Sequence, residues 1–309
     1  MQGRIRRSDA RKELKMAITI NTNLSSMIVQ SNLNKATNSL NQAIERMTTG
    51  YKINHASDNA AGYSIATNWE TQLGSLDVAA DNAATGADMM TTLEDTYSLV
   101  STHLQRVRDL TEQAANGTYG SASLKAIQSE ITARLEEVDR IAANCEFNGL
   151  NMMDGSMGEI SLQVGLYSDA SSQIKLSADL FKKGDVATLF KDYGNVTGAS
   201  VEEVAKLCSG YDGTKIIGNQ NAMLDKIDAV INEISARTTT LGSAQNRIDS
   251  AIESIAVQSE NITSSLSTLR DADVAEESSA YIKAQILQQA SATLLATANQ
   301  APSIALNLL

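Results

Sequence analysis

The chain is short of the residues that build aromatic cores and interrupt helices. Among 309 residues it has one tryptophan, one proline and three phenylalanines, and aromatic residues make up 4% of the total. Large cores usually contain more aromatic side chains, and proline is the strongest helix breaker. The two cysteines, Cys145 and Cys208, are too few for a disulfide framework. These shortages favour long helices that pack closely through small aliphatic side chains.

Patterns that carry common chemistry are also missing. His55 and His103 are the only histidines, so the H-E-x-x-H zinc signature cannot form. No phosphate-binding G-x-x-x-x-G-K-[ST] loop occurs, and Cys145, far from either histidine in sequence, is predicted to be a buried thiol. We therefore expect no catalytic residue, no metal, no cofactor and no enzyme activity.

The charge balance limits the partners. The net charge of −11 argues against nucleic acid or an anionic membrane. No apolar run reaches the ~18 residues that would span a bilayer, and the apolar positions of 17–29 are too mixed with polar residues for a cleaved secretion signal. Residues 1–16 are basic and end at a second methionine, so we expect an upstream extension or a cloning remnant; the alternative is a basic docking arm.

The strongest positive signal is a hydrophobic repeat near the C-terminus. Its members are spaced alternately three and four residues apart, which specifies a long helix packed along other long helices. We predict this helix at Asn221–Arg270. The repeat consists of Leu224, Ile227, Ile231, Ile234, Thr238, Leu241, Gln245, Ile248, Ile252, Ile255, Ser259, Ile262, Leu266 and Leu269.

Similar periodicity predicts further helices. Asp271 and Asp273 are expected to cap the last one, which should end before Pro302. Two segments that alternate with period two, Glu159–Gly165 and Gln173–Leu176, are predicted to form a β-hairpin. The additional helices are expected at 24–49, 63–115, 124–143, 201–207 and 274–299.

The predicted fold class is mainly α: a long antiparallel helical bundle or coiled-coil rod built from both chain ends, with a small insert that contains the β-hairpin. The terminal helices carry apolar residues on more than one face, as in the runs Met27–Val29, Ile286–Leu287 and Leu294–Leu295. A two-helix pair cannot cover so much apolar surface, which marks an interface. Identical contacts that do not close would give a helical filament.

Several motifs, in the same order at both ends of the chain, closely resemble bacterial flagellin. The resemblance covers roughly residues 17–165 and 221–309. It is carried by AITINTN (17–23), SNLNK (31–35), AIERMTTG (43–50), DNAAG (58–62), LQRVRDL (104–110), EFNG (146–149) and LRDADVAEE (269–277).

The resemblance implies a subunit that self-assembles into an extracellular flagellar filament used for motility. Residues 17–58 and 271–309 would form an inner coiled-coil domain, and residues 59–165 and 219–270 a surrounding helical rod. Residues 166–218 would be a short variable insert in place of large outer domains. The terminal segments would be disordered in the monomer and fold on assembly.

The family also implies partners. Export would proceed through the flagellar type III apparatus with a chaperone on the C-terminal segment, followed by contacts with filament cap and hook-junction proteins. One segment of the second long helix matches the patch that the vertebrate Toll-like receptor for flagellin recognises, although subunit packing alone would explain the same residues. This receptor or subunit interface comprises Gln105, Arg106, Val107, Arg108, Leu110, Gln113 and Glu130.

A second set of residues, the assembly seam, is predicted to pack helices together in the filament. It comprises Leu33, Leu40, Met47, Ile248, Ile252, Ile255, Leu287, Leu294 and Leu295. The alternatives are a hook–filament junction protein, which shares the terminal segments, and a secreted coiled-coil adhesin or effector, which would bind without polymerising. An enzyme within 166–218 is disfavoured because the segment lacks a catalytic constellation.

Overall fold

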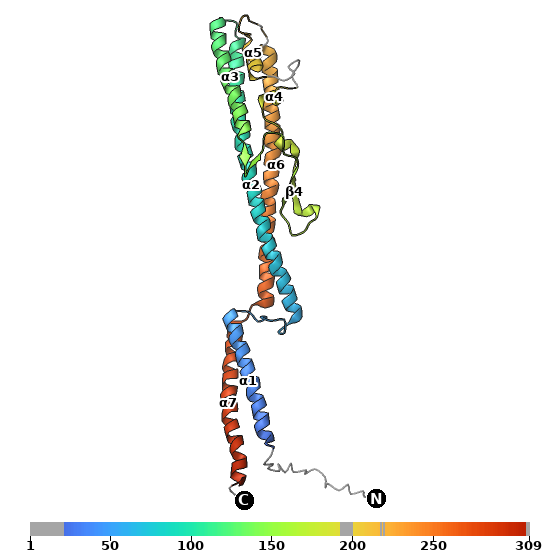
Figure 1. Ribbon diagram of the computed structural model, residues 1–309, viewed down its shortest axis with the longest axis vertical. Helices are drawn as coiled ribbons and strands as arrows, with labels where there is room; N and C mark the ends of the chain where they lie inside the picture. The colour runs from blue at the N-terminus through green and yellow to red at the C-terminus, as the bar shows by residue number, and fades with distance from the viewer. Residues whose placement is uncertain (1–21, 192–199, 217, 219, 307–309) are drawn as a thin grey trace, which may run out of the picture. The chain divides into compact units, whose positions relative to one another are not determined.

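The computed structural model describes residues 22–191, 200–216, 218 and 220–306. The chain forms two compact units. One contains the described residues up to Trp69 together with those from Ser264 onward, and the other is Glu70–Thr263. Helix α2 and helix α6 each contribute to both units. The helices of the described residues are α1 (Leu24–Thr49), α2 (Ala60–Ala115), α3 (Ser121–Ala143), α4 (Val186–Leu189), α5 (Val201–Ser209), α6 (Gln220–Arg270) and α7 (Val274–Leu306) (Figure 1).

The mainly α fold class is confirmed. The described strands form two small antiparallel hairpins, and none of the helices in the described part of the chain combines the length and hydrophobicity that a bilayer crossing requires. In the first hairpin, Asn148 and Gly149 both have positive φ, as a two-residue turn between antiparallel strands requires. The strands are β1 (Glu146–Phe147) paired with β2 (Leu150–Asn151), and β3 (Ile160–Gln163) paired with β4 (Gln173–Leu176).

The unit Glu70–Thr263 has a continuous hydrophobic core built by α2, α3, α6 and the segments between α3 and α6. Tyr97 of α2, Leu135 of α3 and Ile248 of α6 are completely buried in it. The hydroxyl of Tyr97 donates a hydrogen bond of 2.8 Å to the carbonyl of Leu180, in the 3-10 turn Ala178–Phe181. This bond ties the segment after the second hairpin to the long helix.

The second hairpin lies on α2 at a glycine. The side chain of Leu162 in β3 occupies the place where a side chain on Gly86 would be. The amide of Asn82 donates to the carbonyl of Gln163, 3.2 Å away, one turn before that glycine. The small residue therefore allows the close approach of strand and helix.

The buried face of α6 is wider than the predicted repeat. Its fully buried central row has a seven-residue spacing, from Ile227 through Ile234 and Leu241 to Ile248. Beside it lies a second buried row, which includes Met223, Val230, Arg237 and Ala244, whereas the predicted members Leu224 and Ile231 are only half-buried. The cause is that α6 contacts α2 on one side and the 178–182 segment on the other, where Arg237 donates to the carbonyl of Lys182.

Three of the predicted helix boundaries need correction. Helix α2 begins at Ala60, three residues before the predicted start at residue 63. The side chain of Asn59 accepts a hydrogen bond from the N–H of Gly62 and so caps the helix. Helix α3 likewise begins at Ser121 instead of Leu124. Helix α7 does not end at Asn299 but continues through Pro302 to Leu306. Proline's fixed φ is compatible with a helix, but proline supplies no N–H for the carbonyl four residues earlier, and its ring crowds that carbonyl.

The break between α6 and α7 is where the sequence predicts it, with one change of role. Asp273 caps α7, accepting from the N–H groups of Ala275 at 2.7 Å and Glu276 at 3.4 Å. Asp271 does not cap α7: its carboxylate accepts from the hydroxyl of Ser267, in the last turn of α6. The expectation that both acids serve α7 is therefore wrong for Asp271.

Candidate assembly surface

Helices α1 and α7 lie side by side and run in opposite directions (Figure 1). Apart from Glu277, the side chains buried between them are small: Ala36, Ala43, Ala284 and Ser291. Small residues allow two helices to approach closely, but they leave the larger apolar side chains with no place inside the pair.

Most of the large apolar side chains of this pair point outward. Their exposed fractions reach 66% at Leu24 and 59% at Met27 in α1, and 63% at Val274 in α7. Monomeric proteins rarely leave such surface uncovered. The other exposed members are Ile28, Ile44, Met47, Ile282, Ile286, Leu287 and Leu294.

Polar side chains set the register of the pair. Where α1 ends and α7 begins, the guanidinium of Arg46 donates to the carboxylate of Glu277 at 3.1 Å, and Glu277 is buried. At mid-length the amide of Gln288 donates to the hydroxyl of Thr37 at 3.2 Å. At the far end, the hydroxyl of Ser26 donates 2.8 Å to the side-chain carbonyl of Asn299. A slip by one helical turn would break these contacts together.

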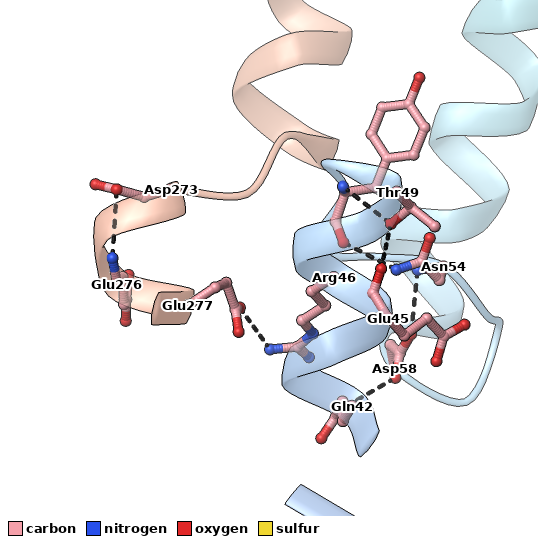
Figure 2. A network of polar contacts seen from close by, with 10 residues as sticks. Gln42, Glu45, Arg46, Thr49, Asn54, Asp58, Asp273, Glu276 and Glu277 are labelled. Carbon is pink, nitrogen blue, oxygen red and sulfur yellow. Dashed lines mark hydrogen bonds and ion pairs between the residues drawn. The ribbon is translucent and has the colours of Figure 1, made fainter. Parts of the chain in front are cut away.

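Figure 2 shows the polar network where α1 ends and α7 begins. Asp58 accepts hydrogen bonds from the backbone N–H groups of Asn54 and His55 and from the amide of Gln42 in α1. The bond from the N–H of His55 is the largest cause that lowers the pKa of Asp58 below its usual value. The loop between α1 and α2 is thereby held to α1 by one ionised carboxylate.

Backbone contacts join the same loop to the end of α6. The N–H of Lys52 donates to the carbonyl of Arg270 at 2.7 Å, and the N–H of Ala272 donates to that of Gly50 at 2.8 Å. The guanidinium of Arg270 lies 4.2 Å from the centre of the Tyr51 ring, a cation–π contact. The loop between α1 and α2 is therefore fixed to the end of α6 by backbone and side-chain contacts.

The predicted receptor or subunit interface divides into exposed and buried residues. Arg106 of α2 and Glu130 of α3 are partly exposed and form an ion pair of 3.0 Å. Gln105 is exposed, and the amide of Gln113 donates to the hydroxyl of Tyr119. These residues lie on an accessible surface of the Glu70–Thr263 unit.

The remaining members of that interface serve the unit itself. Val107 and Leu110 are 0% and 2% exposed, so a partner cannot reach them in this conformation. Their spacing of three residues places both on the core side of α2, which the motif alone did not reveal. Arg108 joins α2 to α6 through an ion pair of 2.5 Å with Asp228.

The assembly seam also divides. Met47, Leu287 and Leu294 are exposed, and Leu33, Leu40 and Leu295 are half-buried in the α1–α7 pair. Ile248 and Ile255 are instead buried inside the Glu70–Thr263 unit, with Ile252 half-buried beside them. The α6 members therefore build the subunit's own core, because their heptad row faces α2 and not solvent.

Two buried charges were missed by the sequence analysis. The sequence analysis assigns no buried role to Glu277, in the first turn of α7, or to Arg237, which lies between the repeat positions Ile234 and Thr238. Arg237 is 8% exposed and bonds to Glu233 of its own helix at 2.6 Å. The i, i+4 spacing of Glu233 and Arg237 was the only available signal for this pair.

Neither a metal-binding cluster nor an exposed thiol occurs among the described residues. No group of three or more His, Cys, Asp or Glu side chains among them is placed to hold a metal ion. Both cysteines are buried, and burial raises the pKa of the Cys208 thiol to about 12. Such a thiol is protonated at neutral pH and is a poor nucleophile.

Two family models match the chain. The bacterial flagellin N-terminal helical region matches residues 20–157, and the bacterial flagellin C-terminal helical region matches residues 224–309. The chain belongs to the bacterial flagellin family. As a flagellin it is a structural protein: flagellins polymerise with themselves into the flagellar filament, which is extracellular.

Similar flagellins cover nearly the whole chain. Polar flagellin F of Vibrio parahaemolyticus is 31% identical over 376 aligned positions, with 95% of this chain and 100% of that protein covered. Flagellin A of Vibrio anguillarum is 32% identical over 379 positions with the same coverage. Because these alignments are longer than the 309-residue chain, the relatives contain residues that have no counterpart in this flagellin.

A solved structure supports the fold of this flagellin. A Vibrio parahaemolyticus protein provisionally described as flagellar hook-associated matches with a TM-score of 0.57, covering 69% of this chain and 100% of its own. Its sequence identity is 13%, so the likeness concerns the fold alone.

Proposed function

We propose that copies of this flagellin assemble through the outward apolar side chains of α1 and α7. The observation that carries the proposal is the inverted packing of the pair, in which alanines face inward while Leu24, Met27 and Leu294 stay more than half exposed. Burying apolar surface against a neighbouring copy contributes about 25 cal/mol per Å². The filament would then complete a hydrophobic core that one copy lacks.

The parts of the chain would have different roles in the filament. Residues 17–58 with 271–309 would form the inner, assembly-dependent part of the filament. Residues 59–165 with 219–270 would form a rod that is stable by itself, which is supported by the continuous core around Tyr97, Leu135 and Ile248. Residues 166–218 would face outward as a short insert.

Seeded polymerisation tests the proposal. Leu294→Asp places a charge on the exposed face of α7, where it costs little in the monomer but several kcal/mol once a neighbouring copy covers it. We expect this full-length variant to keep the monomer's thermal unfolding temperature and to form no filaments after short filament seeds are added, as judged by sedimentation and electron microscopy.

Gln289→Asp is the matched control. Gln289 is an exposed polar residue of the same helix, so the variant adds the same charge without removing an apolar side chain. We expect it to polymerise. Normal polymerisation of Leu294→Asp would contradict the proposed surface, and equal loss in both variants would mean that charge alone, not the apolar contact, decides the outcome.

We also propose partners other than copies of the chain itself. The exposed α7 face would hold an export chaperone before secretion and would later contact filament cap and hook-junction proteins. The accessible residues Gln105, Arg106, Gln113 and Glu130 would be the part of the predicted patch open to the vertebrate Toll-like receptor or to a neighbouring copy. We propose no catalytic activity, since the two thiols are buried and protonated.

A further inference from the structure

The chain's only proline lies inside a helix and leaves one carbonyl without its usual donor. Pro302 is within α7, which extends to Leu306. In an α-helix the N–H of each residue donates to the carbonyl four residues earlier. Proline has no N–H, so the carbonyl of Ala298 cannot receive that bond. A carbonyl at a closed interface that lacks any donor is costly.

Asn23 supplies the missing donor from the other helix. Its side-chain Nδ2 donates to the carbonyl of Ala298 at 2.7 Å. Its Oδ1 accepts from the backbone N–H of Ser26 at 3.0 Å and so caps the start of α1. The two bonds determine the orientation of the Asn23 amide: the N–H of Ser26 needs the amide oxygen as acceptor, and the carbonyl of Ala298 needs the amide nitrogen as donor.

Asparagine is suited to this double task. Aspartate, serine and threonine also cap helices well. Ionised aspartate, however, only accepts hydrogen bonds, whereas asparagine has an acceptor oxygen and two donor hydrogens. A side chain that caps α1 and also donates to α7 must therefore have both an acceptor and a donor, as asparagine does.

We propose that Asn23 is a positioning residue for filament assembly, joining the start of α1 to the proline-containing turn of α7. Ser26 adds a neighbouring bond to Asn299, so this end of the pair is held at two successive residues of α7. The inference rests on the proposed assembly through α1 and α7.

A double-mutant cycle on the full-length chain tests it. Asn23→Asp keeps the α1 cap but replaces the donor by a carboxylate that repels the carbonyl of Ala298. Pro302→Ala restores an N–H that can bond to Ala298 within α7. The measurement is the critical concentration of seeded polymerisation. We expect Asn23→Asp to raise it roughly tenfold, which corresponds to about 1.4 kcal/mol, and Pro302→Ala to change it less than about twofold.

The decisive result is the cost of Asn23→Asp in the Pro302→Ala background. We expect it to fall below about threefold, or, where Asn23→Asp alone does not polymerise, we expect the second change to restore filaments. The control Asn34→Asp, at an exposed position of α1, adds the same charge and should have the same effect on the critical concentration in both backgrounds.

Several outcomes would overturn the role of Asn23. These are an equal cost in both backgrounds, no cost in either, or failure of Pro302→Ala itself to polymerise, since that change should only restore a bond. Because the comparison is a difference between two backgrounds, its result is separate from that of Leu294→Asp, which tests the apolar surface.

Discussion

Asp139 shows at the scale of one residue how burial opposes ionisation in this protein. It lies on α3 and accepts a hydrogen bond of 2.7 Å from the backbone N–H of Val186, the first residue of α4. Burial is the main cause that raises the pKa of Asp139, and nearby Asp185 raises it further, whereas the Val186 N–H and Lys183 act to lower it. Its ionised form is therefore disfavoured in the folded chain.

The raised pKa predicts a pH-dependent gain in stability for Asp139→Asn, which keeps an acceptor for the N–H of Val186 but removes the charge. A carboxyl group whose pKa is raised by folding contributes stability that appears as pH falls through that pKa and is absent at neutral pH. We expect Asp139→Asn to be more stable than the parent at pH 7, and the difference to shrink toward pH 4. Urea unfolding of the monomer across this range measures it.

The matched control is Asp109→Asn, at an exposed position of α2 with no tertiary hydrogen bond among the described contacts. The free energy of unfolding of this variant should differ little from that of the parent over the same pH range. A stability difference for Asp139→Asn that grows as pH falls would mean that the carboxylate is stabilised by the fold, contrary to the raised pKa.

Single residues were the hardest to place from sequence. The cap at Asp273 and the buried thiol of Cys145 followed from local patterns and are confirmed. The pairing of Arg46 with Glu277 joins residues 231 positions apart, and no local rule indicates it. The motif places Val107 and Leu110 among the contact residues because it gives residue types without showing which side of the helix faces the core.

At the scale of elements, α6 is stabilised by a row of completely buried isoleucine and leucine side chains. Ile248 lies in this row, whereas Val257, two to three turns later on the same helix, is 52% exposed. The two residues share helix and chemistry and differ in burial. They therefore separate the contribution of core packing from that of helix propensity.

We predict that Ile248→Ala lowers the free energy of unfolding of the monomer by about 2–5 kcal/mol, because it leaves a cavity in the core. Val257→Ala should change it by less than about 0.5 kcal/mol. Both values come from urea unfolding followed by circular dichroism. Similar losses in the two variants would show that the buried row does not carry the stability of this unit.

Helix positions were predictable because the heptad spacing and the caps are local signals. The start of α1 at Leu24, the break after Arg270 and the strand Gln173–Leu176 lie where the sequence places them. The continuation of α7 past Pro302 was not predicted. In that turn the carbonyl of Ala298 accepts from the side chain of Asn23, which lies 275 residues earlier, and no local signal indicates such a partner.

At the scale of the whole molecule, the two units solve burial differently. The Glu70–Thr263 unit encloses large side chains such as Tyr97 and Phe181 in a core of its own. The unit formed by the chain ends buries mainly alanines and leaves its large apolar residues exposed. The first is complete within one copy, and we propose that neighbouring copies complete the second in the filament.

Electron cryomicroscopy of filaments grown from the full-length chain tests this account most directly. We predict that Leu24, Met27, Ile286 and Leu294 are buried against neighbouring copies, while Tyr97 and Ile248 keep only contacts within their own copy. A filament in which the outer faces of α1 and α7 remain open to solvent would contradict the central claim, even if its dimensions were those of a flagellum.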